Sequence, residues 1–428
     1  MAELRRLSLA AAVLINLNII VGSGIFINTV ILAQLAGIAS ALTYVLVGLL
    51  VLPLMISFAC LARRHQGGSL YSYSAGLGSY PAFFSIWGYA LTKLASCAVA
   101  IHVCASLLSS IIPLLARAPI LTVDLCILSL FTVLNCYHAH VGTKLQRLFV
   151  VGKMVPIGTV LVLGSWYFSS AMVPATLATS LSGVFAGIPF VLYAFMGFEA
   201  SAGFNRQLVD PERNGWRAMA ISFVIGVVVT TLFQWLLFGS VPHIAQLSSY
   251  RDLFPALLAS WHLSDSLRTV ALVFLHGGIA VSAAGVGFGI LYANAGNFFE
   301  LAEHKFIPRI VGYRNESYTP VYCLLLEALL VALYLTVGYQ SLPMLQQLAA
   351  CGATCTYVVS VIALFKDYSS SSRVRTVAVL GLLSCAVLLC AVLRNFVVIS
   401  SLPLLLFVAI HLIGLAFYST ATLVRRTI

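Results

Sequence analysis

Long apolar segments dominate this sequence, and they constrain the fold more than any other feature. A helix of about 20 apolar residues spans the hydrocarbon core of a bilayer. Reading the chain for such runs gives twelve segments: 8–36, 38–62, 82–112, 120–137, 147–171, 179–203, 217–240, 268–302, 318–336, 342–365, 374–394 and 398–424. We therefore expect an all-α membrane protein in which residues 1–428 form a single domain of twelve transmembrane helices.

The composition excludes several classes of protein. Hydrophobic residues make up 61% of the chain and charged residues 8%, whereas a soluble domain carries about 25% charge. We therefore expect a chain surrounded by membrane lipid, and neither a water-soluble enzyme nor a nucleic-acid-binding domain. The sequence has no nucleophile–base set, no metal-binding motif and no G-x-x-x-x-G-K-S/T loop. It thus predicts no catalytic residues, no metal and no cofactor.

Basic residues are distributed unevenly between alternate loops. If the N-terminus is cytoplasmic, 17 of them lie on that side, and the other side holds Arg117, Arg251, Arg268 and Arg394. Cytoplasmic loops of membrane proteins carry an excess of Lys and Arg. The asymmetry therefore predicts a multi-pass protein of the plasma (inner) membrane with both termini in the cytoplasm. It also accounts for most of the formal net charge of +11.

Two of the segments carry the signals of an interrupted helix. Residues Asn18–Phe26 read N-I-I-V-G-S-G-I-F, and Tyr193–Glu199 read Y-A-F-M-G-F-E. Glycine weakens a helix, and unpaired backbone groups are tolerated at membrane depth only where they line a cavity. A close-packing face of small residues is the alternative for Gly22 and Gly24, but their spacing is not the four-residue repeat of such faces. Interruptions in the first and sixth spans indicate an inverted-repeat transporter, whose half-helix ends suit a zwitterion.

Four motifs, in order along the chain, carry a resemblance to a known family. They are G-S-G-I-F at Gly22–Phe26, a glycine- and tyrosine-rich segment at Gly67–Tyr73, Q-x-x-x-x-x-x-K at Gln146–Lys153, and F-M-G-F-E at Phe195–Glu199 with D-P-E-R-N at Asp210–Asn214 in the following loop. On these motifs the chain resembles the amino acid–polyamine–organocation family of amino acid permeases. The loop at 302–308 departs from the family pattern, because it lacks the usual aspartate and glycine.

The resemblance implies a leucine-transporter-like fold. Residues 1–171 and 179–365 would form a 5+5 inverted repeat with helices 1 and 6 broken, and 374–424 would form two peripheral helices. In the family, the backbone of the broken first span holds the substrate carboxylate, and the backbone of the sixth span holds the amine. Carried over to this sequence, the implied substrate-binding residues are Val21, Gly22, Ser23, Gly24 and Ile25 in the first span, and Tyr193, Ala194, Phe195 and Gly197 in the sixth. Tyr193 matches the aromatic gate of the family, with Phe195 as the alternative.

Ionisable residues within the spans are functional candidates. The resemblance implies a proton-coupling role for Lys153, because sodium-coupled relatives bind a cation at its position; the alternative is a lysine that snorkels to the interface. Glu199 is expected to receive a proton, to bind the substrate ammonium, or to accept from N–H groups at the break. Lys93 either repels cationic substrates or pairs with Glu199 or Glu327. Glu327 itself has no assigned role.

A few further residues complete the set of candidates. Phe288 in span eight is a candidate wall of the substrate pocket. Three histidines on apolar spans are interpreted as packing residues: His102, His276 and His411.

The sequence and the resemblance together predict a secondary active amino acid transporter that works by alternating access. We expect proton-coupled uptake of neutral amino acids by a monomer or homodimer. An amino acid or amine exchanger is the first alternative, because exchangers share the same motifs, and a non-transporting amino acid sensor is the second. A channel is disfavoured because the two helix breaks differ in sequence, which fits one asymmetric site.

Overall fold

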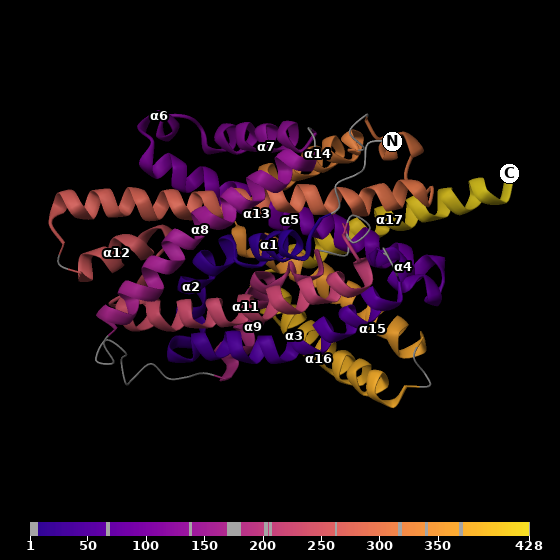
Figure 1. Cartoon of the computed structure of the whole chain (residues 1–428), viewed down its shortest axis with the longest axis horizontal. Helices are drawn as coiled ribbons and strands as arrows, with labels where there is room; N and C mark the ends of the chain where they lie inside the picture. The colour runs from indigo at the N-terminus through magenta and orange to yellow at the C-terminus, as the bar shows by residue number, and fades with distance from the viewer. Residues whose placement is uncertain are drawn as a thin grey trace.

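The chain folds into a bundle of long helices (Figure 1). The structure, a computed structural model, describes residues 7–65, 69–136, 139–168, 181–200, 204, 208–261, 263–315, 319–338, 341–367 and 371–427. Its elements are α1 (Leu9–Ile20), α2 (Ser23–Ala36), η1 (Gly37–Ala39), α3 (Ser40–Arg64), α4 (Leu70–Ser74), η2 (Ala75–Leu77), α5 (Ser79–Ile111), α6 (Pro113–Ala116), α7 (Ile120–Cys136), α8 (Ala139–Tyr167), α9 (Leu181–Phe195), η4 (Phe198–Ala200), α11 (Pro211–Ser240), η6 (Ile244–Gln246), η7 (Tyr250–Asp252), α12 (Leu253–Ser260), α13 (Asp265–Glu303), η8 (Arg309–Gly312), α14 (Val321–Gly338), α15 (Leu342–Asp367), α16 (Ser372–Val398) and α17 (Leu402–Thr427).

The length and hydropathy of these helices confirm a multi-pass, nearly all-helical protein. Within the described residues, ten helical stretches are long and apolar enough to cross a bilayer. The first of them, Leu9–Arg64, is 56 residues long and contains α1, α2 and α3, whereas α7 is shorter than the ten. The described part of the chain has no β-strand, only an isolated bridge between Leu7 and Leu208. The count of twelve spans stays a prediction.

Two long helices, α5 and α13, pack against each other through the middle of the bundle (Figure 1). Every residue of α5 from Ser85 to Leu107 is buried, as expected for a helix surrounded on all sides by other helices. Helix α13 carries the small-residue run S-A-A-G-V-G-F-G at 282–289, which lets α1 approach closely. The Asn18 side chain of α1 donates to the backbone oxygen of Gly285 at 2.8 Å.

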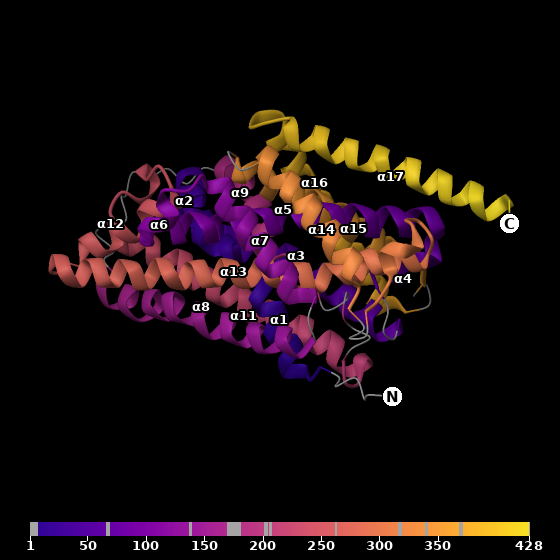
Figure 2. The ribbon, with the colours of Figure 1, turned by 90° about the horizontal axis from the view of Figure 1, so that it is seen from above.

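The two ends of the bundle are distinguished by their short elements. Helices α6 and α12 lie toward one end, and α4 and the C-terminal end of α17 lie toward the other (Figures 1 and 2). Helix α17 runs along the outside of the bundle (Figure 2). Only 11% of its most apolar stretch of 18 residues is buried. Its exposed leucines are suited to contact with lipid.

Some predicted boundaries need correction. Residues 210–214 were expected in a loop, but α11 already begins at Pro211. Proline is favoured in the first turn of a helix because its φ is already helical and its missing N–H has no partner there. Asp210 precedes the helix with a φ of 49°. Of the glycine-rich motif, Gly67 and Gly68 lie outside the described residues, and Ser69 caps α4.

Candidate functional site

The first helix break separates α1 from α2 at Val21 and Gly22. The amide of Gly22 donates to the carbonyl of Ile20 at 3.1 Å, so the regular helical pattern is lost here. A Cβ at Gly22 would lie 2.0 Å from Cγ2 of Val286 in α13, which only a glycine avoids. The predicted interruption of the first span therefore exists, and it faces α13.

Lys153 of α8 binds the carbonyl groups that this break exposes. Its Nζ donates to the backbone oxygens of Asn18 and Val21, each at 2.7 Å. The side chain is fully buried, so Lys153 does not snorkel to the interface. A helix end carries carbonyls without intrahelical partners, and an ammonium group satisfies two of them here.

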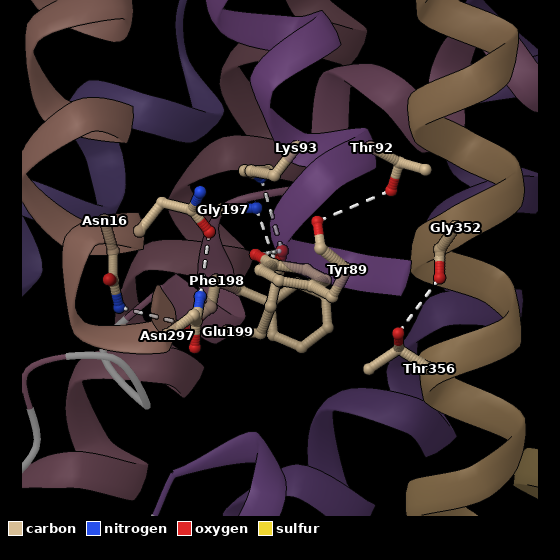
Figure 3. Close-up of polar contacts among 11 residues, drawn as sticks. Asn16, Tyr89, Thr92, Lys93, Gly197, Phe198, Glu199, Asn297, Gly352 and Thr356 are labelled. Carbon is tan, nitrogen blue, oxygen red and sulfur yellow. Dashed lines mark hydrogen bonds and ion pairs between the residues drawn. The ribbon is translucent and has the colours of Figure 1, made fainter. Parts of the chain in front are cut away.

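The second break follows α9 and is turned toward the first. Gly197 has a φ of +146°, and a Cβ there would lie 2.7 Å from Cγ2 of Ile19 in α1. The side chain of Asn16 in α1 donates to the carbonyl of Phe198 at 3.2 Å. Contacts with α1 thus hold the segment that follows α9 in place (Figure 3).

Glu199 lies at the centre of a buried network just beyond this break (Figure 3). Its Oε2 accepts from the backbone N–H of Gly197 at 2.9 Å, and its Oε1 accepts from the Tyr89 hydroxyl at 2.6 Å. The ammonium of Lys93 lies 3.4 Å from Oε1. Of the two carboxylates considered for Lys93, the structure therefore pairs it with Glu199. Glu199 also satisfies an N–H group that the break leaves free.

Two cavities lie between these helices, and Lys93 lines both of them. The site cavity is lined by Ile19, Ile20, Ser23, Gly24, Lys93, Ser96, Tyr193, Ala194, Met196, Val286 and Ile290. The inner cavity is lined by Ile19, Leu70, Tyr89, Lys93, Glu199, Ala200, Ile290, Ala293, Asn294 and Asn297. The inner cavity includes a residue of α4 and therefore lies toward the α4 end of the bundle.

The lining of the site cavity is mostly apolar and includes a few polar side chains. Its polar groups are the hydroxyls of Ser23, Ser96 and Tyr193 and the ammonium of Lys93. Apolar side chains from α1 and α13 form much of the rest of the lining. A mostly apolar cavity with a few convergent polar groups is typical of a small-molecule site.

The other predicted site residues lie around this cavity. Ile25 is buried in α2, and Phe195 packs edge-on against Tyr44. Phe288 contacts the rings of Phe131 and Phe149 and lines neither cavity. On α13 the cavity walls are instead formed by residues of another helix face, including Val286 and Ile290.

Sequence reasoning overlooked several residues that the structure brings to the site or its surroundings. Ser96 lies one turn beyond Lys93 on α5, so the helical period could have identified it. Asp124 of α7 is a further buried acid, and its carboxylate lies 2.9 Å from Nδ1 of His102. Asp124 was not identified from the sequence because it lies near the start of its span, where an acid can reach water. His102 is therefore an ion-pair or hydrogen-bond partner as well as a packing residue.

Comparisons with known proteins show which sequences this chain is similar to. A family model described as "Amino acid permease" matches residues 7–421. Proteins named "Uncharacterized transporter" from Mycobacterium tuberculosis and Mycobacterium bovis are each 27% identical over 295 residues, which are 68% of this chain and 63% of theirs. Cationic amino acid transporter 9, chloroplastic, of Arabidopsis thaliana is 24% identical over 304 residues, 64% of this chain and 53% of that protein. The chain thus spans less than two thirds of the length of these relatives.

Proposed function

The chain belongs to the amino acid permease family, and from this membership and the geometry we propose that it is a secondary active amino acid transporter working by alternating access. The observation that carries the proposal is the meeting of two interrupted helices, α1–α2 and α9–η4, at one cavity. The family and the relatives named as transporters indicate a transporter rather than an enzyme. The proposed fold has twelve spans, with 1–171 and 179–365 as inverted repeats and 374–424 as peripheral helices.

The helix ends around the cavity suit the two charges of an amino acid. Helix α2 begins at Ser23, so the first amides of α2, including those of Ser23 and Gly24, have no partner four residues earlier. The partial positive charge of a helix N-terminus attracts a carboxylate. Helix α9 ends at Phe195, where carbonyl groups are available to an ammonium. We place the substrate carboxylate at Val21–Ile25 and the amine at Tyr193–Phe195.

Lys93 supports a neutral substrate side chain. Its ammonium is paired with Glu199, but only Lys93 of the pair lines the site cavity, whereas Glu199 lines the inner cavity. A cationic side chain in the site cavity would therefore meet the positive end of the pair and be repelled. The Arabidopsis relative is named for cationic amino acids, and the proposal made here departs from that name in substrate class. Alanine-, serine- and leucine-like substrates are therefore preferred over arginine and lysine.

The bonds of Lys153 to the broken first span support coupling to a proton. A protonated amine donates to two carbonyls of α1, and a neutral amine would hold them less strongly. Protonation would therefore change how firmly the break is held. Amino acid exchange is the second candidate function, and the site residues identified here serve it equally well.

The proposed orientation places both termini in the cytoplasm of a plasma-membrane protein. The basic residues at the ends of α3 and α15 support it, because they meet on one face of the bundle. Arg64 lies 3.6 Å from Asp367, and Lys366 donates to the carbonyl of Gly76 at 2.9 Å. Both contacts lie toward α4.

Uptake into proteoliposomes tests this function. The full chain is reconstituted, and a panel of radiolabelled amino acids is offered with and without an inward proton gradient. We expect saturable uptake of neutral amino acids that the gradient stimulates, and loss of that stimulation in Lys153→Ala. Lys366→Ala removes an exposed lysine and is the matched control.

Three results would redirect the proposal. Uptake that requires an amino acid preloaded inside the vesicles would identify an exchanger. Binding without flux would identify a sensor. Arginine as the preferred substrate would contradict the role given to Lys93.

A further inference from the structure

Glu327 of α14 is a buried carboxyl group that the proposed transport mechanism leaves unused. Its side chain is fully buried. Among the described residues, no group makes a hydrogen bond of good geometry with either carboxyl oxygen. An unpaired carboxylate in such a place is costly, and intramembrane acids are rare unless they have a function.

Among the described residues, no cation is paired with Glu327, although Arg314 acts on the neighbouring Cys323 thiol. Helix α14 packs against α5, α7, α13, α15 and η8. The titratable groups that interact with the carboxyl are two thiols, Cys97 of α5 and Cys323 of α14 itself. Helix α13 contributes the uncharged side chain of Asn294, and no described charge on α7, α15 or η8 acts on the carboxyl. The neutral, protonated acid is therefore the stable form.

Glu199 provides the contrast within the same protein. It is as buried as Glu327, but Lys93, Tyr89 and the amide of Gly197 surround its oxygens. A cation and two hydrogen-bond donors stabilise an ionised carboxylate. The two buried acids thus differ in their partners, although both lie in the same bundle.

The side chain of Asn294 links Glu327 to the inner cavity. Asn294 lies beside the carboxyl of Glu327 and also lines that cavity. Its amide donates to the carbonyl of Ala90 at 3.0 Å and its oxygen accepts from Asn297 at 2.9 Å, and Asn297 lines the cavity as well. A rotation of Asn294 would bring the acid into contact with water in the cavity.

We propose that Glu327 is a second proton-binding group of the transporter: it holds a proton when the site is closed and exchanges it with water in the inner cavity beside Asn294. The step is a single proton transfer from the carboxylic acid to a water molecule, which leaves a carboxylate, and its reversal. The assignment of this proton to the transport cycle rests on the proposed function, whereas the protonation of Glu327 does not.

Infrared spectroscopy of the full chain in lipid tests the protonation directly. A protonated carboxylic acid has a C=O stretching band that a carboxylate lacks. We expect this band in the wild type at neutral pH and its loss in Glu327→Gln, an isosteric and uncharged replacement that keeps the fold. We also expect the band to shift promptly when the sample is transferred to D₂O. Glu303→Gln is the matched control, because it makes the same substitution at an exposed acid.

Two results would overturn the proposal. Spectra of wild type and Glu327→Gln that coincide would mean that Glu327 is ionised. A band that does not shift in D₂O would mean a sealed structural acid. In proteoliposomes we expect Glu327→Gln to lose the stimulation by a proton gradient and to keep gradient-independent flux. A wild type without any stimulation refutes the proposed coupling, and the infrared result then stands on its own.

Discussion

At the scale of single residues, the pair formed by Lys93 and Glu199 offers the sharpest test of how the site is held together. Removing one partner of a buried ion pair costs about 3–5 kcal/mol, because the other charge is left unbalanced. Glu199→Gln keeps an oxygen and an NH₂ group that can bond to Gly197 and Tyr89. It leaves the ammonium of Lys93, 3.4 Å away, without a negative partner. We therefore expect Glu199→Gln to lower the melting temperature and uptake strongly.

The double variant Lys93→Met with Glu199→Gln completes this test. It leaves no buried charge at the site, so we expect it to be more stable than Glu199→Gln alone and its effects to be far from additive. Thermal unfolding of the purified protein and uptake are measured on four samples: the wild type, Lys93→Met, Glu199→Gln and the double variant. Additive losses of stability would show that the two side chains do not interact.

At the scale of helices, Gly197 is the residue on which the second break depends. Its φ of +146° is rarely adopted by other residues, and a Cβ would approach Ile19 Cγ2 to 2.7 Å. Strain of this kind costs on the order of 1–3 kcal/mol. We expect Gly197→Ala to reduce uptake and the yield of folded protein, measured by transport and size-exclusion chromatography. In Gly158→Ala the added Cβ meets no atom within 4 Å, so this variant should match the wild type.

The two helix breaks could be predicted from sequence because their causes are local. Glycines within apolar segments weaken the helix wherever they stand, and the position of Lys153 is fixed by a motif. Which face of each helix points toward the cavity could not be predicted in the same way. Phe288 was expected to line the pocket, yet the rotation of α13 directs its ring to Phe131. That rotation is set by packing between helices rather than by residue type.

At the scale of the whole molecule, the helical bundle was readable from hydropathy, but the pairing of charges was not. Lys93 had two possible acidic partners in the sequence, and only the packing of α5 against the segment that follows α9 pairs it with Glu199 rather than Glu327. The burial of Asp124 was not predicted, because this residue lies near the start of a span, where an acid can reach water. In the structure it is buried against His102. Long-range contacts of this kind carry no signal in a single sequence.

The orientation of the bundle yields a prediction for the whole chain. Seventeen basic residues lie in loops assigned to one side, and cytoplasmic loops hold such an excess. The C-terminal end of α17 lies at the same end as α4, and α12 lies at the other (Figure 2). Alkaline phosphatase is active only outside the cytoplasm, so we expect it to be inactive when fused after Thr427 and active when fused after Trp261. Green fluorescent protein at the same two positions should give the reverse pattern. Phosphatase activity at the C-terminus would invert the topology and, with it, the assignment of the inner cavity to the cytoplasmic side.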